Sequence, residues 1–193
     1  MNFNELSDEA KERAFESFKN RELYDNHWAH CVFDDWVERL GAVGIDTEVY
    51  DMHFSGFHSQ GDGASFEGKV DLKLFLEAHP ELRKNHAELY MSTVPFDTLS
   101  DDFAEYTLLL RKTKYSQYSH ENTITLEWEI WTHDIGKFDS VMMQAEPDIL
   151  ERCRECMREL YNDLQNAYEY EFSMDNFFDG VEYQDFEEDG SLS

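Results

Sequence analysis

The stretch IDTEVYDMHFSGFHSQGDGASFEGKVDLKL, residues 45–74, decides the fold class of this chain. Residues 45–57 alternate between two faces and are rich in β-branched and aromatic side chains, which favours a strand over a helix. Residues 64–74 predict a return strand. Between them, Gly61 and Gly63 can adopt positive φ, and Asp62 can form an Asx-type turn. The stretch therefore predicts a β-hairpin, and with it an antiparallel sheet.

The flanking sequence adds helices and a second pair of strands. Periodicity and capping signals predict helices at residues 8–20, 27–44, 80–91 and 147–172, a short final helix at 173–183, and strands at 103–118 and 122–134. This order predicts an α+β protein with a mainly antiparallel sheet of about four strands, covered by helices, and a long C-terminal helix. We expect a single domain over residues 1–183 and a mobile, acidic tail over residues 184–193.

The charge of the chain restricts its partners. Its 43 acidic residues outnumber 16 basic residues, which gives a formal net charge of -27, and no Lys or Arg follows Arg158. Such a field repels nucleic acid and anionic lipid and attracts basic surfaces. The apolar runs are too short to span a bilayer. We therefore expect a partner protein with a basic surface, and neither direct nucleic-acid binding nor membrane binding. Formation of a homodimer remains an open alternative.

The glycine-rich segment lacks the motifs of known ligand loops. No Gly-Lys-Ser/Thr follows it, a strand rather than a helix comes next, and the oxygen ligands of an EF-hand are absent. A structural turn is the favoured interpretation. If the loop is functional, Ser59, Gln60, Asp62 and Ser65 would carry recognition. Two alternatives stay open, namely an enzyme using His58 with Asp62 and a protein that sequesters a nucleotide-like ligand.

The cysteines and histidines give weak signals for a metal site. Cys153 and Cys156 lie three residues apart on the last long helix, and zinc would need two further ligands, for which His27, His30 and Cys31 are candidates. Small buried hydrophobic residues are the favoured interpretation of the pair. We therefore expect no metal and no cofactor. Three cysteines without a secretion signal favour a reduced, cytoplasmic setting.

Several segments resemble one family of small proteins. FNELSDEAKERA (3–14), YDNHWAHCVFDDWVERLGAVGI (24–45) and FSGFHSQGDGASFEG (54–68) together resemble bacteriophage and mobile-element proteins usually labelled "antitoxin of toxin-antitoxin stability system". The YEYEF segment (168–172) and the acidic tail are also similar. The resemblance implies a phage or mobile-element setting and a binding role, and it carries over no catalytic residue.

These observations together predict a non-enzymatic protein that binds and neutralises another protein. The target would be a toxin, a host defence factor or a DNA-handling enzyme, and imitation of DNA is one way in which the protein would bind it. Exposed aromatic residues interleaved with acids would supply the affinity. The predicted partner-binding residues are Ser59, Gln60 and Asp62 in the loop, and Phe177, Phe178, Asp179, Glu182, Tyr183, Asp185 and Phe186 near the C-terminus.

Overall fold

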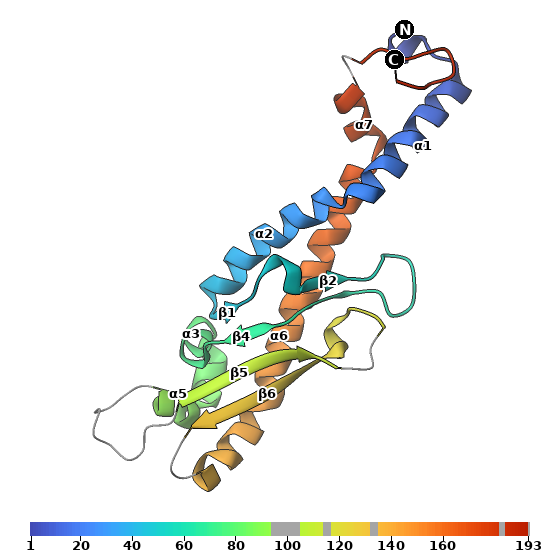
Figure 1. The fold of residues 1–193 in the computed structure, drawn as a ribbon. Coiled ribbons are helices and arrows are strands. Elements are labelled where there is room, and N and C mark those ends of the chain that lie inside the picture. Colours follow the sequence, from blue (N-terminus) through green and yellow to red (C-terminus); the bar gives the residue numbers. More distant parts are fainter. Residues whose placement is uncertain (94–104, 114–116, 132–134, 182–183, 193) are drawn as a thin grey trace. The chain divides into compact units, whose positions relative to one another are not determined.

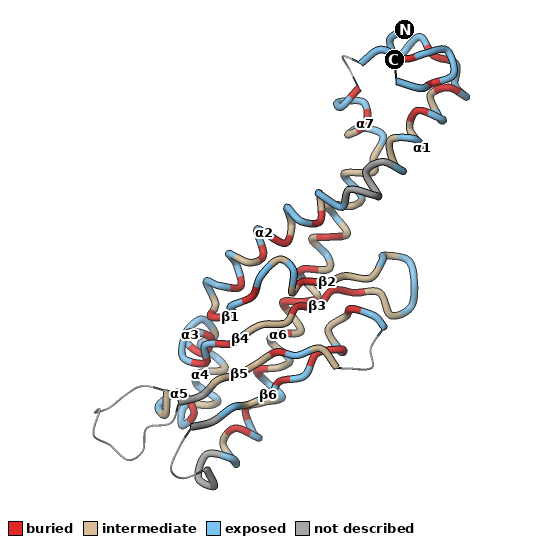
Figure 2. The backbone as a smooth tube through the Cα atoms, viewed as in Figure 1, coloured by how far each residue is buried: buried red, intermediate tan, exposed pale blue. Residues whose placement is uncertain are grey.

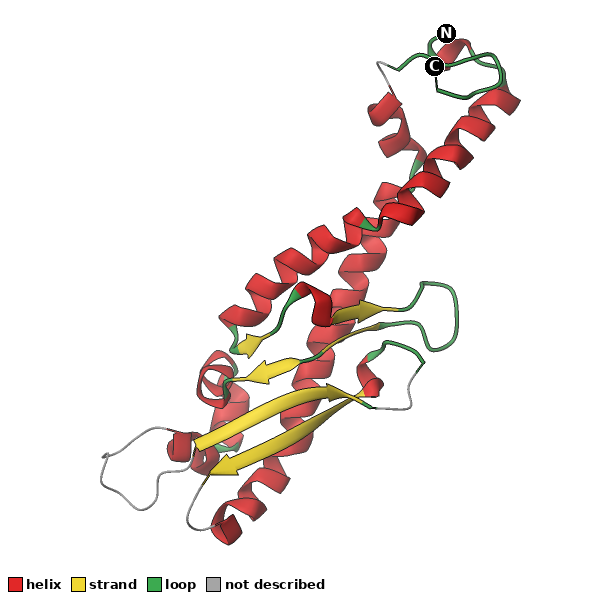
Figure 3. Cartoon of the chain, viewed as in Figure 1, coloured by secondary structure: helices red, strands yellow, loops and turns green. Residues whose placement is uncertain are grey.

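The computed structural model describes residues 1–93, 105–113, 117–131, 135–181 and 184–192. Its elements are shown in Figures 1 and 3. In chain order they are η1 (Phe3–Glu5), α1 (Asp8–Asp25), α2 (His27–Ala42), β1 (Ile45–Asp46), η2 (Val49–Asp51), β2 (Met52–Phe54), β3 (Ala64–Phe66), β4 (Gly68–Val70), α3 (Leu72–Ala78), α4 (Pro80–Asn85), α5 (Ala87–Thr93), β5 (Glu105–Lys112), η3 (Glu121–Thr123), β6 (Ile124–Trp131), α6 (Ile135–Glu171) and α7 (Met174–Val181).

The predicted fold class is confirmed: the protein is α+β. Four strands form an antiparallel sheet in the order β1-β4-β5-β6, and β2 pairs with β3 in a separate two-stranded sheet. The long C-terminal helix is α6. None of the helices within the described residues is long and apolar enough to cross a bilayer.

The pair of β5 with the edge strand β6 shows the alternation that the sequence predicts. Leu110 of β5 lies opposite Leu126 of β6, and both side chains are buried, whereas Thr125 and Glu127 on the other face of β6 are exposed. Helix α6 passes behind this sheet (Figure 1), and the Arg154 guanidinium donates to the carbonyl oxygens of Glu121 in η3 and of Ile124 at the start of β6. The sheet therefore buries one face against α6.

The hairpin strands are shorter than predicted. The predicted strand 45–57 divides into β1, η2 and β2, and the predicted return strand 64–74 divides into β3, β4 and α3. The chain changes sheets near Thr47, whose hydroxyl donates to the Glu67 carbonyl at 2.6 Å. Gly68 permits this crossing, because a Cβ there would lie only 3.1 Å from Thr47 Cβ. Asp71 then caps α3 and ends the strand.

Two helices also differ from their predicted bounds. The predicted helix 80–91 is interrupted at His86, between α4 and α5. Helix α6 begins at Ile135 rather than at Pro147, which lies inside it. A proline usually marks a helix start, but here Met142, Ala145 and Ile149 continue one buried stripe through it. That burial extends the helix past its apparent start signal.

The contacts of the chain form two compact units. We call Met1–Val32 with Asp163–Ser193 the terminal unit, and Phe33–Asn162 the central unit. The largest fully buried side chains of the central unit include Phe66, Phe75 and Met157. The core of the terminal unit consists of Phe3, Leu6, Ala10, Ala14, Phe177, Val181 and Phe186. Figure 2 shows the buried positions of each unit in red.

Candidate functional site

The loop of residues 55–63 joins β2 to β3 in the central unit and carries the polar residues predicted for recognition. The Ser55 amide donates to the Gly63 carbonyl at its base, at 3.0 Å. Gly61 has φ of +99°, as predicted, but Gly63 has no positive φ, so that part of the prediction is wrong. Gly63 is needed for a different reason: a Cβ there would lie 2.9 Å from the Cα of His120. Glycine at position 63 therefore allows the backbones of Gly63 and His120 to approach each other closely.

Asp62 holds the loop together from within. Its Oδ2 accepts the backbone N–H groups of His58 at 2.7 Å and of Ser59 at 2.6 Å. Asp62 therefore organises the loop, but its bonds run to residues that precede it, whereas the predicted Asx-type turn would bond an N–H group two residues ahead, so that part of the prediction is wrong. Two amides that could bind an anionic ligand already point at this carboxylate. The loop consequently offers little to a phosphate group, which would also face the charge of Asp62.

A polar cluster fixes the base of the loop to the turn before β6. The Ser55 hydroxyl donates to the Ser119 carbonyl at 3.2 Å, and the Ser119 amide donates back to that hydroxyl at 3.1 Å. The ammonium group of Lys112, at the end of β5, donates to the Ser119 hydroxyl at 3.0 Å. These bonds tie the hairpin to the four-stranded sheet, so the loop stands on a fixed base.

Aromatic rings support the other side of the loop. Phe57 stacks on Phe54 with ring centroids 5.6 Å apart, and on Tyr161 of α6 with centroids 5.5 Å apart. Burial, and secondarily the negative charge of Asp62, raise the pKa of the Tyr161 hydroxyl above its ordinary value. The phenol therefore stays neutral beside the carboxylate, and the stack holds the loop against the helix.

The tip of the loop is the part that a partner could reach. His58, Ser59 and Gln60 are exposed, and Figure 2 shows this tip in pale blue. Ser65, a further recognition candidate, lies in β3 with only 1% of its surface exposed, so its predicted recognition role is wrong. Among the described residues its hydroxyl has no hydrogen-bond partner. Recognition by this loop would fall to Ser59 and Gln60.

The C-terminal aromatic residues do not form the exposed surface that the sequence predicts. Phe177 is 1% exposed and Phe186 is 3% exposed, so the prediction that they are exposed anchors is wrong. Phe178 is 42% exposed, and Asp179 and Asp185 are exposed as predicted. Glu182 and Tyr183 lie outside the described residues.

Both buried phenylalanines belong to the core of the terminal unit. The ring of Phe3 makes edge contacts with Phe177 at 5.1 Å and with Phe186 at 5.6 Å between centroids. The segment that carries Phe186 is paired with the other end of the chain: the Phe186 amide donates to the Met1 carbonyl at 2.8 Å, and the Met1 amine donates to the Phe186 carbonyl at 2.9 Å. Sequence patterns cannot show a pairing across 185 positions.

Comparison with known protein families adds one finding. A family model described as a domain of unknown function, DUF8835, matches residues 28–174. The chain belongs to the DUF8835 family. Neither the curated proteins nor the solved structures contain a match to it. The DUF8835 match includes the whole of the loop 55–63 and ends before Phe177.

The cysteine pair of the DUF8835 region is buried in the apolar face of α6. Cys153 is fully buried and Cys156 is mostly buried. Burial is the main cause that raises the pKa of both thiols above their ordinary value. Across the described residues, no group of three or more His, Cys, Asp or Glu side chains is arranged to hold a metal ion. The pair therefore packs as small hydrophobic side chains, as the sequence predicts.

Proposed function

We propose that this protein binds a partner protein with a basic surface and neutralises its action. The observation that carries the proposal is the net charge of -27 on a folded chain of 193 residues. Charge of this size attracts a basic surface from a distance and raises the rate of encounter. It also repels nucleic acid and anionic membranes, so it selects among partners.

The negative charge per residue is higher in the terminal unit than in the central unit. This unit contains seventeen acidic residues against four Lys or Arg residues. Lys19 pairs with Glu16 of its own helix, and the Arg13 guanidinium donates to the backbone carbonyl of Asp189 rather than to a carboxylate. Four cations cannot neutralise seventeen carboxylates, so a basic partner would meet a surplus of acceptors here.

The biological setting of the proposal rests on the resemblance to phage and mobile-element antitoxin-labelled proteins. A toxin, a host defence factor or a DNA-handling enzyme in the cytoplasm of a bacterial host would each present the required basic surface. DNA imitation is a special case of this proposal, in which the protein covers the DNA-binding surface of its partner. The geometry of Asp62 disfavours the alternative of a nucleotide-sequestering loop, since its carboxylate occupies the loop amides.

Affinity capture from a bacterial lysate, followed by binding measurements with the purified partner, tests the proposal. We expect the association rate to fall by about tenfold or more between low and high salt, because screening removes long-range attraction. A partner of the DNA-imitation type must also lose its DNA when this protein is added. Association that ignores salt, or an acidic partner, would contradict the proposal. Ser59→Ala with Gln60→Ala then asks whether the loop tip contributes to the contact.

A further inference from the structure

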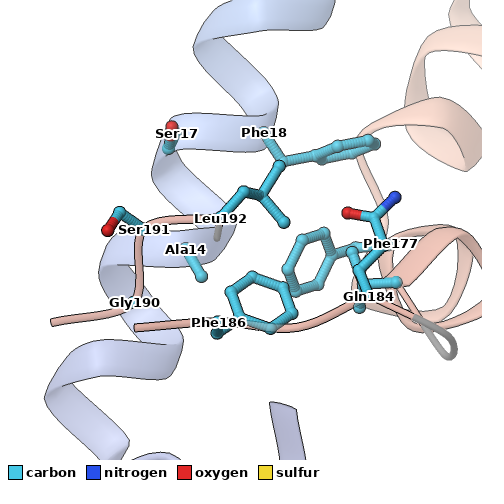
Figure 4. Close-up of a pocket in the computed structure, with 10 residues that line it drawn as sticks. Ala14, Ser17, Phe18, Phe177, Gln184, Phe186, Gly190, Ser191 and Leu192 are labelled. Carbon is cyan, nitrogen blue, oxygen red and sulfur yellow. The ribbon is translucent and has the colours of Figure 1, made fainter. Parts of the chain in front are cut away.

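The terminal unit contains a pocket that its own core does not fill. Figure 4 shows it between α1, α7 and the segment of residues 184–192. Its volume is about 140 Å³. Phe18, Phe177, Val181, Phe186 and Leu192 line it together with Ala14 of α1, and none of the described residues that line it is charged. The lining is mostly apolar, with Ser17, Gln184 and Ser191 as its polar members.

The pocket is accessible from outside. Leu192, at its edge, is 48% exposed, and Ser17, Gln184 and Ser191, which also line it, are exposed. A cavity of roughly 150 Å³ lined by apolar side chains holds a benzene-sized group. The volume here thus suits one large apolar side chain, such as that of a phenylalanine or a leucine.

The surroundings of the pocket are acidic. Asp185, Glu187, Glu188 and Asp189 lie on the segment that closes it and are exposed. The Asp185 carboxylate lies 3.8 Å from the Met1 amine, and the Asp189 carboxylate accepts from the Ser191 hydroxyl at 2.7 Å. No Lys or Arg occurs in this segment or in α7. An apolar pocket with an acidic rim complements an apolar side chain with basic neighbours.

We propose that this pocket receives a large apolar side chain from a basic segment of the partner protein. The inference rests on the proposed function and assigns its anchor point. The apolar side chain displaces water from the pocket and supplies affinity, while flanking Lys or Arg residues contact the acidic rim and supply selectivity. A second copy of this chain is disfavoured as the occupant, because two molecules of charge -27 repel each other.

Peptide binding tests the proposal directly on the full chain. The probe is a fluorescein-labelled peptide with one central phenylalanine and about three lysines on each side, and its binding is measured by fluorescence anisotropy. We expect it to bind at least about tenfold more tightly than the same peptide with alanine at the centre. We also expect it to bind more tightly than a phenylalanine peptide flanked by glycine and serine.

Two pairs of variants locate the contact. Ala14→Leu fills the pocket from within α1 and retains a good helix former, so it should fold and lose at least about tenfold in affinity for the phenylalanine peptide. Its circular dichroism spectrum and melting temperature verify the fold. Asp185→Asn with Glu188→Gln should weaken binding, whereas Asp34→Asn with Asp35→Asn, which changes the net charge equally on exposed α2 positions, should not.

Each other outcome overturns the proposal. Equal binding of the phenylalanine and alanine peptides would mean that charge alone acts, and equal binding of the uncharged phenylalanine peptide would mean that the pocket takes any apolar group. Undiminished binding to Ala14→Leu would place the contact elsewhere. If the captured partner binds Ala14→Leu as well as it binds the wild type, the pocket is not the anchor but the proposed function stands. If no salt-sensitive partner exists, the proposed function itself fails.

Discussion

The Oδ2 atom of Asp62 lies 2.6 Å from the backbone nitrogen of Ser59 and accepts its N–H. The same oxygen accepts the N–H of His58. A carboxylate thus sits where a phosphate-binding loop would hold its ligand, and the loop 55–63 is closed by its own side chain. Ser59 and Gln60 at its tip remain exposed to solvent.

We predict that Asp62→Ala destabilises the protein by about 1–2 kcal/mol, because two charge-assisted hydrogen bonds to loop amides are lost at a half-buried position. Urea unfolding followed by circular dichroism measures the change. Ser59→Ala is the matched control, since its side chain is exposed, and it should stay within about 0.5 kcal/mol of the wild type. Equal stability of the two variants would show that the Asp62 bonds do not hold the loop.

Gly63→Ala should destabilise the protein by about 1–3 kcal/mol, since the added Cβ would lie 2.9 Å from the Cα of His120 and backbone must move. Gly41→Ala is the control: a Cβ there meets nothing within 4 Å, and the residue lies in α2 without a positive φ. It should stabilise the protein by up to about 1 kcal/mol. Thermal unfolding of both variants provides the comparison, and a tolerated Gly63→Ala would contradict the close approach of the loop base to His120.

Features that depend on local periodicity could be predicted from the sequence. The alternation of β6 and the apolar stripe of α6 each repeat over short distances, and the glycines on either side of Asp62 indicate a turn. Features that depend on distant partners could not. The break between β1 and β2 requires the Thr47 contact with Glu67, twenty positions away. The start of α6 requires a buried stripe that outweighs the helix-start signal of Pro147.

The C-terminal segment shows the same limit most clearly. Phe186 lies among Asp185, Glu187 and Glu188, a pattern typical of a solvated tail. Its burial is decided by the backbone pairing with Met1 and by the ring of Phe3, both at the other end of the sequence. Acidic neighbours indicate an exposed strand face or loop, but they leave open where a single aromatic side chain in their midst will pack.

We predict that Phe186→Ala destabilises the terminal unit by about 3–5 kcal/mol, because a buried ring is removed from its core. Phe178→Ala, at a position 42% exposed, should cost no more than about 1 kcal/mol. Hydrogen exchange of the amides in residues 1–20 reports on this unit directly. If residues 184–192 were a mobile tail, both variants would change the stability of the terminal unit equally little. Similar exchange rates in the two variants would therefore contradict the packing of Phe186.

The three cysteines should differ sharply in reactivity. Cys31 is exposed, whereas Cys153 and Cys156 are buried in the apolar face of α6 and their thiols have raised pKa values. Because the thiolate is the reactive form, we expect a disulfide reagent to label one thiol per chain rapidly in the native protein and all three in denaturant. Peptide mass spectrometry should place the rapid label on Cys31, and rapid labelling of Cys153 would contradict its burial.

The same burial predicts a loss of stability at high pH. Burial, together with the neighbouring Cys156, raises the pKa of the Cys153 thiol above its ordinary value of 9.0, while Arg152 opposes the shift. The folded chain then binds more protons than the unfolded chain once the pH exceeds the ordinary value, so the free energy of unfolding falls as the pH rises above about 9 and is unaffected well below it. One thiol contributes a slope of at most about 1.4 kcal/mol per pH unit.

Urea unfolding of the wild type, Cys153→Ala and the control Cys31→Ala between about pH 7 and pH 10.5 measures this slope. Other groups that titrate in this range are common to all three proteins, so the slope should decrease in Cys153→Ala alone, and parallel curves for all three would contradict the prediction.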